Sequence, residues 1–194
     1  MSNFPPTGSG QDEKNRMTKP ADTDAIPKFA IFRRDDAPAF GETEVMHYGE
    51  LTEEQKQGSA LVSEAGLMEG NRLQLLFAIP GMSLAYAWFK SGFPLPRHSH
   101  SADCLYYIIG GSLRMGDQEL KAGDGFFIGT DVPYSYVPGD EGVEVLEFRT
   151  SSHFDIKLLV NNPAYWVKAA EKIRERLPAW KEEKVSPSGI MRDA

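Results

Sequence analysis

The sequence has one cysteine, Cys104, among 194 residues, and it has no long apolar run. A single cysteine excludes a disulfide within the chain and is usual for proteins of the reducing cytoplasm. A membrane-spanning helix needs about 20 predominantly apolar residues in a row, and no such stretch is present. Residues 1–8 also lack the basic and then apolar pattern of a secretory signal. We therefore expect a cytoplasmic protein without a membrane-inserted segment.

An excess of positive charge is also missing. The chain carries 21 lysine and arginine residues against 28 aspartate and glutamate residues, which gives a formal net charge of -7. Nucleic acids and anionic membranes attract basic surfaces, so we expect neither as a partner. The composition, 41% hydrophobic and 25% charged, is that of an ordinary globular protein, and the length favours one domain.

Short strands separated by turn residues make up most of the chain. A Pro80-Gly81 turn lies between two apolar segments of strand length. The strands that we expect are 30–34, 73–78, 83–90, 104–109, 112–115, 119–121, 125–128, 132–137, 143–149 and 156–159. Because no helices alternate with these strands, the pattern predicts an all-β sandwich or barrel rather than a parallel sheet.

Two helices are expected outside the strand region. Thr52 and Gln55 have the spacing of a capping box, which predicts a brief helix that ends at Gly58. Asn162-Pro163 is a typical helix start, and apolar residues follow it at helical spacing. We expect this second helix to pack one face on the strands and to end at Pro178.

Two histidines, His98 and His100, stand two residues apart on a segment that reads as extended. Alternate residues of a strand point to the same face, so both imidazoles reach one place. Two neutral imidazoles that converge are the beginning of a transition-metal site. The alternative is a pair of exposed histidines in a loop that follows Pro94 and Pro96.

The stretch that contains both histidines resembles the first sequence motif of the cupin superfamily, G-x5-H-x-H-x3-E-x6-G. Gly92, His98, His100 and Gly111 match this motif in spacing, and Cys104 occupies the position of the glutamate. The resemblance covers roughly residues 73–159.

The second cupin motif, G-x5-P-x-G-x2-H-x3-N, is matched only in its length and in the Gly-Asp turn at residues 123–124. Gly129 stands in the position of the proline and Asp131 in that of the glycine. Tyr134 stands in the position of the histidine and Pro138 in that of the asparagine.

The resemblance implies a double-stranded β-helix barrel, the cupin fold, with a C-terminal α-helix and a flexible N-terminal arm. We place the arm at residues 1–25, the barrel with its N-terminal extension strands at 26–160, and the helix with a frayed tail at 161–194. Cupin barrels commonly pair. The resemblance therefore also implies a homodimer, in which the segments before Leu73 exchange or add at a sheet edge.

A cupin normally brings three histidines and a glutamate to its metal, and this chain keeps two histidines. The resemblance implies one divalent transition metal (Fe, Zn, Ni or Mn) on His98, His100 and Cys104, at low occupancy. Thiolate is a good ligand for such metals. The alternative for Cys104 is a small buried hydrophobic residue. His47 and His153 are further candidates for a third imidazole, or surface residues.

Aromatic residues and arginines are the candidates for contacts with an organic substrate. Tyr134 and Tyr106 are candidate catalytic groups, because a neutral phenol donates a proton or a hydrogen bond. Arg149 is a candidate anchor for a substrate carboxylate, and Arg97 is another. The candidates for an apolar cavity wall are Trp88, Phe127, Tyr136, Tyr86, Tyr106 and Phe126. The alternatives are core packing for the aromatic residues and surface ion pairs for the arginines.

Two functions from different classes follow. The first is a cupin enzyme acting on a small organic molecule, a metal-dependent oxygenase, lyase or isomerase. The second is a cupin module that binds a small organic molecule, or has an accessory role, without a metal. The two histidines favour the first, and the missing histidine and glutamate favour the second. The fold does not decide between them, because cupins host many unrelated chemistries.

Overall fold

The computed structural model describes residues 26–193, and two β-sheets form its body. The larger sheet has the strand order β2-β3-β8-β5-β6, with β7 also paired to β5, and the smaller sheet has the order β1-β9-β4. Among the strands of residues 26–193, only β1 and β9 pair in parallel. The predicted all-β class with a C-terminal helix is confirmed. The strands are β1 (Met46–Tyr48), β2 (Asn71–Ile79), β3 (Met82–Phe89), β4 (His98–His100), β5 (Cys104–Met115), β6 (Gln118–Lys121), β7 (Gly125–Ile128), β8 (Val137–Arg149) and β9 (Phe154–Leu158).

Several strands differ from the expected ones. β5 is a single strand with an irregular register against β8, where two shorter strands were expected. The expected strand at 132–137 is wrong, because Tyr134 makes only an isolated bridge to His98. Asp131 adopts a left-handed backbone with φ of 60°, and Pro133 has no N–H for a strand ladder. The expected strand at 30–34 is also absent, and this segment leads into the 3-10 turn η1 (Arg34–Asp36).

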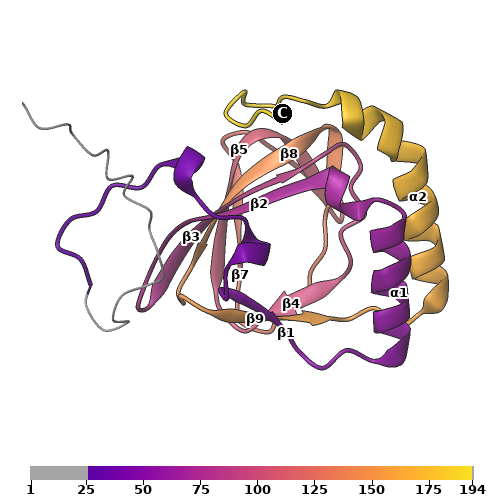
Figure 1. Ribbon diagram of the computed structural model, residues 1–194, viewed down its shortest axis with the longest axis horizontal. Coiled ribbons are helices and arrows are strands. Elements are labelled where there is room, and N and C mark those ends of the chain that lie inside the picture. Colours follow the sequence, from indigo (N-terminus) through magenta and orange to yellow (C-terminus); the bar gives the residue numbers. More distant parts are fainter. Residues whose placement is uncertain (1–25, 194) are drawn as a thin grey trace, which may run out of the picture.

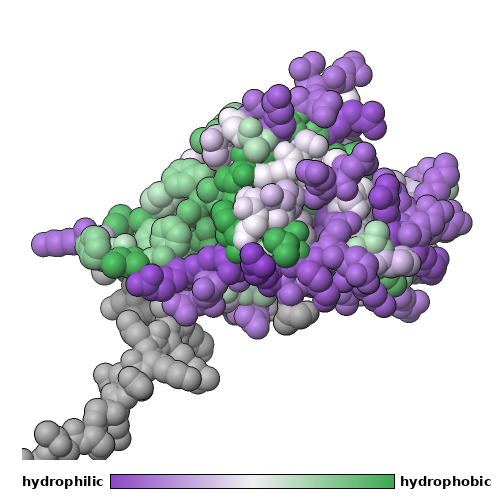
Figure 2. All heavy atoms as spheres, turned by 90° about the horizontal axis from the view of Figure 1, so that it is seen from above, coloured by the Kyte–Doolittle hydropathy of each residue, from purple (hydrophilic) through white to green (hydrophobic). Residues whose placement is uncertain are grey.

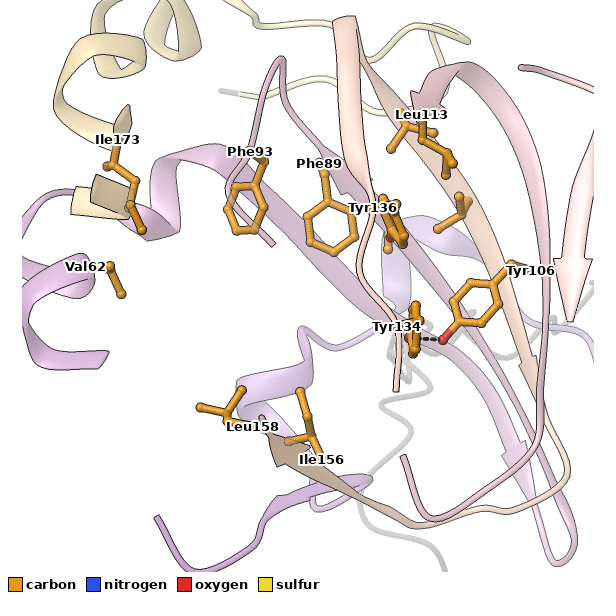
Figure 3. Packing of buried hydrophobic residues seen from close by; sticks show 14 of the residues in the cluster. Val62, Phe89, Phe93, Tyr106, Leu113, Tyr134, Tyr136, Ile156, Leu158 and Ile173 are labelled. Atoms are coloured by element: carbon orange, nitrogen blue, oxygen red, sulfur yellow. Dashed lines mark hydrogen bonds between the residues drawn. The ribbon is translucent and has the colours of Figure 1, made fainter. Parts of the chain in front are cut away.

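The hydrophobic core lies between the two sheets and continues to the helices. Phe89 and Tyr106 from the larger sheet and Ile156 from β9 belong to one buried cluster. The same cluster includes Val62 of α1 (Glu53–Glu64) and Ile173 of α2 (Pro163–Glu182). Figure 3 shows these side chains in one layer between the sheet and the helices. The two helices lie side by side along one flank of the β-sheets (Figure 1).

α1 begins at the predicted capping box. The Gln55 N–H donates to Thr52 Oγ1 at 3.2 Å, and the Thr52 N–H donates to Gln55 Oε1 at 3.1 Å. The predicted end at Gly58 is wrong, because Gly58 lies in mid-helix against Trp166 of α2. A Cβ atom at Gly58 would lie 2.2 Å from the Trp166 indole, so only glycine permits this close approach.

α2 begins where predicted, with Asn162 as its cap, but it does not end at Pro178. The helix continues to Glu182 because Trp180 lies beyond the proline. Trp180 is fully buried, and its indole N–H donates to the carbonyl oxygen of Ser91 at 2.9 Å. Burial of this large side chain holds the last turn although Pro178 cannot donate its backbone hydrogen bond.

Residues 184–193 are docked on the larger sheet rather than frayed. The buried Glu144 of β8 accepts hydrogen bonds from the backbone N–H and, at 2.9 Å, from the hydroxyl of Ser188. Lys90 Nζ lies 2.9 Å from Asp193 Oδ2 and donates to the Trp180 carbonyl oxygen at 2.7 Å. Met191 completes a second hydrophobic cluster here, on the outer face of the larger sheet, with Leu76, Tyr86 and Trp88. This segment covers one end of the sheets in Figure 1.

The predicted flexible arm, residues 1–25, lies outside the described residues. Two further 3-10 turns, η2 (Phe40–Glu42) and η3 (Leu67–Gly70), connect the elements near the N-terminus. Among residues 26–193, no helix combines the length and the apolar composition that a membrane span requires.

Candidate functional site

A cavity of about 1070 Å³ is lined by residues of both sheets and of both helices. Its volume is at the upper end of the range for small-molecule sites, about 300–1,000 Å³. Most of the wall is apolar, with side chains from α1 and α2 opposite the strands. Polar and ionisable side chains line one part of the strand side of the wall: His98, His100, Tyr134, Tyr136, Glu147 and Arg149. Asn71, Arg72 and Gln74 of β2 and the nearby Lys90 also contribute to the lining.

The structure brings His98 and His100 together on this wall. Both side chains are buried, and their ring centroids are 4.9 Å apart. Two backbone hydrogen bonds hold β4 against Tyr134: the His98 N–H donates to the Tyr134 carbonyl at 3.0 Å, and the Tyr134 N–H donates to the His98 carbonyl at 2.9 Å. The Tyr134 ring packs 4.4 Å from the His98 ring, centroid to centroid. Tyr134 therefore adjoins the imidazoles at the position that the motif assigns to a histidine.

Backbone carbonyls orient both imidazole rings. His98 Nδ1 lies 2.8 Å from the Pro96 carbonyl oxygen, and His100 Nδ1 lies 3.3 Å from that of Asp155. A carbonyl oxygen only accepts, so each Nδ1 carries the proton and each Nε2 keeps a lone pair. Burial lowers the pKa of both imidazoles, that of His100 to about 3, and the positive charge of Arg149 acts in the same direction. Both rings are thus neutral hydrogen-bond acceptors at pH 7.

Arg149 is the centre of a buried polar network on the inner face of the larger sheet. The register of β5 and β8 places Tyr106 opposite Glu147 and Cys104 opposite Arg149. Arg149 Nη1 donates to Glu147 Oε2 at 2.6 Å, and Nη2 donates to the Tyr106 hydroxyl at 3.4 Å. The guanidinium carbon lies 4.1 Å from the centre of the Phe154 ring. Burial opposes the charge of Arg149, but the negative charge of Glu147 raises its pKa, so the guanidinium stays protonated.

The hydroxyl groups of Tyr106 and Tyr134 are hydrogen-bonded to each other (Figure 3). Because Arg149 donates to the Tyr106 oxygen, the Tyr106 proton is available for the Tyr134 oxygen. The Tyr134 proton is then available for the cavity, which Tyr134 lines. Burial, followed by the charge of Glu147, raises the pKa of both phenols, so both are neutral at pH 7.

Glu147 did not appear among the candidates from the sequence, although a signal for it was present. Val143, Val145, Glu147 and Arg149 alternate along one strand, and the first two are fully buried. Strand parity places all four side chains on the same face. An acidic residue in register with buried valines and with a candidate arginine was therefore recognisable as part of the site.

Other predicted site residues lie away from the cavity wall. Cys104 is 1% exposed and is not a lining residue, and burial raises the pKa of its thiol to about 12. Trp88 faces the opposite side of the sheet, in the cluster with Met191. Phe127 is 61% exposed on that outer face, opposite Leu105 in the register of β5 and β7.

The remaining candidates also fall into two groups, residues at the cavity and residues away from it. Tyr136 lines the cavity, and Tyr106 lies directly behind Tyr134. His47 and His153 are exposed, with ring centroids 6.5 Å apart, and Arg97 is exposed as well. None of these last three residues lines the cavity.

The donor set does not fit a divalent transition metal. Within residues 26–193, no three His, Cys, Asp or Glu side chains form a group that could hold a metal ion. The cavity offers two imidazoles, whereas protein sites usually supply three or more ligands. Glu147 is engaged in the ion pair with Arg149, so its carboxylate is not free to serve as a ligand. For the metal predicted on His98, His100 and Cys104, the described residues therefore provide two imidazole ligands and no third ligand.

No protein-family model and no curated protein matches the chain. Similar solved structures include an RmlC-like cupin from Shewanella frigidimarina, which is 22% identical over 43% of this chain and 78% of that chain, with a TM-score of 0.39. The fold resembles that of cupins. KdgF from Halomonas sp. is 18% identical over 42% of this chain and 79% of its own, with a TM-score of 0.38. The polyketide cyclase RemF from Streptomyces resistomycificus is 16% identical over 56% of this chain and 84% of its own, with a TM-score of 0.44. These likenesses concern the fold of about half the chain and say nothing of its activity.

Proposed function

We propose that this chain is a small-molecule-binding protein whose cavity takes an organic ligand with a carboxylate or carbonyl oxygen and at least one hydroxyl group. The observation that carries this proposal is the set of complementary hydrogen-bonding groups on one wall. His98 and His100 present two neutral acceptors, and Tyr134 presents a donor that is oriented through Tyr106 by Arg149. The apolar remainder of the wall suits the carbon skeleton of such a ligand.

The network favours a ligand oxygen at Tyr134. Glu147 neutralises most of the charge of Arg149, so a ligand does not meet an unpaired cation. The guanidinium instead polarises the Tyr106 and Tyr134 hydroxyls, and such chains of hydrogen bonds strengthen one another in a medium of low dielectric constant. A carboxylate or carbonyl oxygen of the ligand then accepts from Tyr134. Ligand hydroxyl groups donate to the Nε2 atoms of the two imidazoles, which have no hydrogen-bond partner among residues 26–193, whereas the Nδ1 atoms are bonded to backbone carbonyls.

A ligand-observed NMR screen tests this proposal, with hydroxycarboxylic acids and hydroxyketones as probes and their O-methyl ethers as matched controls. We expect the hydroxylated compounds to bind and the ethers to bind at least about tenfold more weakly, since each ether leaves a buried acceptor unpaired. Equal binding of alcohols and ethers, or no binding of either class, would contradict the proposal.

Substitution of single hydroxyl groups locates the contact. Tyr134→Phe removes the donor and keeps the ring that packs on His98, so we expect affinity to fall about tenfold, or about 1.4 kcal/mol, in isothermal titration. Tyr165→Phe is the matched control, because Tyr165 lines the same cavity from α2, away from the imidazoles. Equal losses in the two variants would show that Tyr134 has no special role.

A second candidate function, a metal-dependent oxygenase, lyase or isomerase, is favoured by one observation. Both histidines donate their Nδ1 proton to a carbonyl oxygen, as metal-ligating histidines usually do. Elemental analysis of the purified protein tests it directly. If a metal binds two imidazoles only, we expect partial occupancy that a chelator removes. Tyr134→His adds a third imidazole and should raise affinity about tenfold or more. Absence of binding in Tyr134→His would eliminate this candidate.

A further inference from the structure

The charge of the cavity wall is opposite in sign to that of the chain. The chain carries a net charge of -7. Among the described residues, however, six lysine and arginine side chains line the cavity against three acidic ones. One of the six is Arg149, which is paired with Glu147. The other five are Arg72, Lys90, Lys181, Lys184 and Arg192. An excess of positive charge in the lining of an acidic protein favours an anionic occupant.

These five cations gather where the end of α2 meets the C-terminal segment, and we call them the cationic mouth. Lys90 Nζ donates to the carbonyl oxygen of Trp180, the residue before Lys181, at 2.7 Å. The same ammonium group donates to Asp193 Oδ2 at 2.9 Å. The backbone N–H of Asp193 donates to the carbonyl oxygen of Lys184 at 2.8 Å. The mouth is therefore one connected part of the cavity wall.

The cationic mouth and the imidazoles lie at different ends of the molecule. Figure 1 shows the end of α2 and residues 184–193 across the sheets from β4, which carries the buried His98 and His100. Lys181, Lys184 and Arg192 are exposed, so the cavity reaches solvent at this end. Figure 2 looks onto the same end and shows hydrophilic residues over the half that α2 occupies.

A row of aromatic rings on the cavity wall connects the two ends. It runs through Trp180, Phe93, Phe89, Tyr136 and Tyr134, and all five residues line the cavity. Successive ring centroids are 5.9, 5.0, 6.1 and 6.5 Å apart. Figure 3 shows the last four of these side chains in order. The wall between the mouth and the imidazoles therefore suits an apolar chain.

The mouth already holds one carboxylate and retains positive charge beyond it. Arg72 donates through Nε and Nη2, each at 2.8 Å, to the two oxygens of Asp193, and Lys90 donates to the same group. This fork is the preferred geometry for an oxyanion. One carboxylate balances only one of these two cations. Lys181 and Arg192 have no ion-pair partner among residues 26–193.

The acidic residues nearby do not remove this excess. Glu69 is the third acidic residue of the lining, and it is exposed. Glu182 and Glu183 follow Lys181 in the chain but do not line the cavity. Glu183 accepts from the backbone N–H of Ser91 at 3.0 Å.

We propose that the cationic mouth binds the carboxylate of an elongated ligand, with Lys181 and Arg192 as the contacting cations. The inference rests on the proposed function for the other end of the ligand, the hydroxylated carbonyl group at Tyr134 and the imidazoles. It adds an apolar chain along the aromatic row and a negative charge at the far end. The ligand class is thus a hydroxylated carbonyl compound whose apolar chain ends in a carboxylate.

A series of hydroxyketones tests the inference by isothermal titration of the full chain. Each probe carries an alkyl chain, of increasing length along the series, that ends in a carboxylate, and its methyl ester is the neutral control. We expect the carboxylates of the best length to bind at least about tenfold more tightly than their esters. The preference should shrink as the ionic strength rises, because exposed charges are screened.

A double variant locates the charge. Lys181→Gln with Arg192→Gln should lower the affinity for the carboxylates about tenfold and leave that for the esters unchanged. Both residues are changed together because exposed ion pairs are individually weak. The matched control is Lys168→Gln with Arg174→Gln. It removes the same charge from exposed positions of α2 that do not line the cavity, and it should leave both affinities as in the wild type.

Octanoate and methyl octanoate separate this inference from the proposed function, since neither has the hydroxyketone group. We expect octanoate to bind more tightly than its ester and to lose this advantage in Lys181→Gln with Arg192→Gln. That result, with no contribution from the hydroxyketone group, would refute the proposed function and leave the cationic mouth standing. Equal affinities of carboxylates and esters would overturn the inference, as would equal losses in the two double variants or a failure of every carboxylate to bind.

Discussion

At the scale of single residues, the pair formed by Glu147 and Arg149 dominates the interior. Two charged side chains lie side by side on the inner face of β8, almost without solvent contact. A buried ion pair contributes little net stability, but removal of one partner leaves an uncompensated charge. The pair therefore makes this part of the core sensitive to single substitutions and tolerant of matched ones.

We expect Arg149→Met to reduce the free energy of unfolding by about 3–5 kcal/mol, because it leaves the Glu147 carboxylate buried and unpaired. The double variant Glu147→Leu with Arg149→Met removes both charges and should lose much less. Urea denaturation of the two variants and the wild type measures the difference. A double variant that is no more stable than Arg149→Met would show that the buried charge is not the cause.

Cys104 gives a second test at this scale. Its thiol is buried and its pKa is raised to about 12, so it is neutral and inaccessible at pH 8. Only a thiolate reacts rapidly with disulfide reagents, so we expect slow reaction with dithionitrobenzoate in the native protein and rapid reaction in urea. The control is Cys104→Ser with Val167→Cys, which moves the thiol to an exposed site on α2. Equal native rates in the two proteins would contradict the burial of Cys104.

At the scale of single residues, the sequence predicted the positions of some side chains but not of others. The spacing of His98 and His100 was sufficient to expect two imidazoles at one place, because strand parity is a local property. The orientation of Trp88 was not predictable in the same way. It depends on which face of β3 meets the other sheet, and both faces of β3 carry large apolar residues. Only the docked tail, distant in sequence, makes the Trp88 face a second core.

At the scale of elements, the segment 184–193 acts as a strap across the larger sheet. Its end is held by Asp193, which contacts the buried Lys90 and the partly exposed Arg72. No periodicity in this polar segment predicts its position, because its partners lie about 40 to 120 residues earlier in the chain. The end of α2 was wrongly placed at Pro178 for a related reason. Packing of Trp180 on Ser91 overrides the local preference of proline.

We expect Asp193→Asn to destabilise the protein by about 3 kcal/mol, because it leaves the Lys90 ammonium buried without a counter-charge. Hydrogen exchange should show loss of protection at residues 184–193. Arg72→Gln is the matched control, since it removes the more exposed partner of the same carboxylate and should cost less than about 1 kcal/mol. Similar losses from both changes would mean that burial of Lys90 is not what holds the strap.

At the scale of the whole molecule, the strands of the larger sheet and their glycine turns were largely predictable, whereas β1 of the smaller sheet was not expected. The pH response depends on burial that only the fold reveals. His98 and His100 are neutral in the folded chain because burial lowers the pKa of both below the ordinary 6.5. The unfolded chain binds protons at these positions once the pH falls below about 6.5. The folded chain does so only near a pH of 3 at His100. The free energy of unfolding is therefore not reduced by these two histidines above pH 6.5, and it decreases as the pH falls below that value.

We expect the free energy of unfolding to decline between pH 6.5 and 3, with His100 contributing up to about 1.4 kcal/mol per pH unit. His100→Gln should flatten the decline, whereas the same change at the exposed His153 should leave the slope as in the wild type. Urea denaturation at several pH values gives these slopes. A slope that is the same in His100→Gln and wild type would show that His100 is not buried in its neutral form.

The contact between Gly58 and the Trp166 ring has a consequence for the shape of the cavity. Both helices contribute to the cavity wall, and the absence of a side chain at Gly58 lets α1 and α2 approach closely. A larger residue at Gly58 would meet the Trp166 indole at 2.2 Å, so α1 and α2 would have to move apart. One position in α1, remote from His98 and His100 in sequence, therefore limits how wide the cavity is on its helical side.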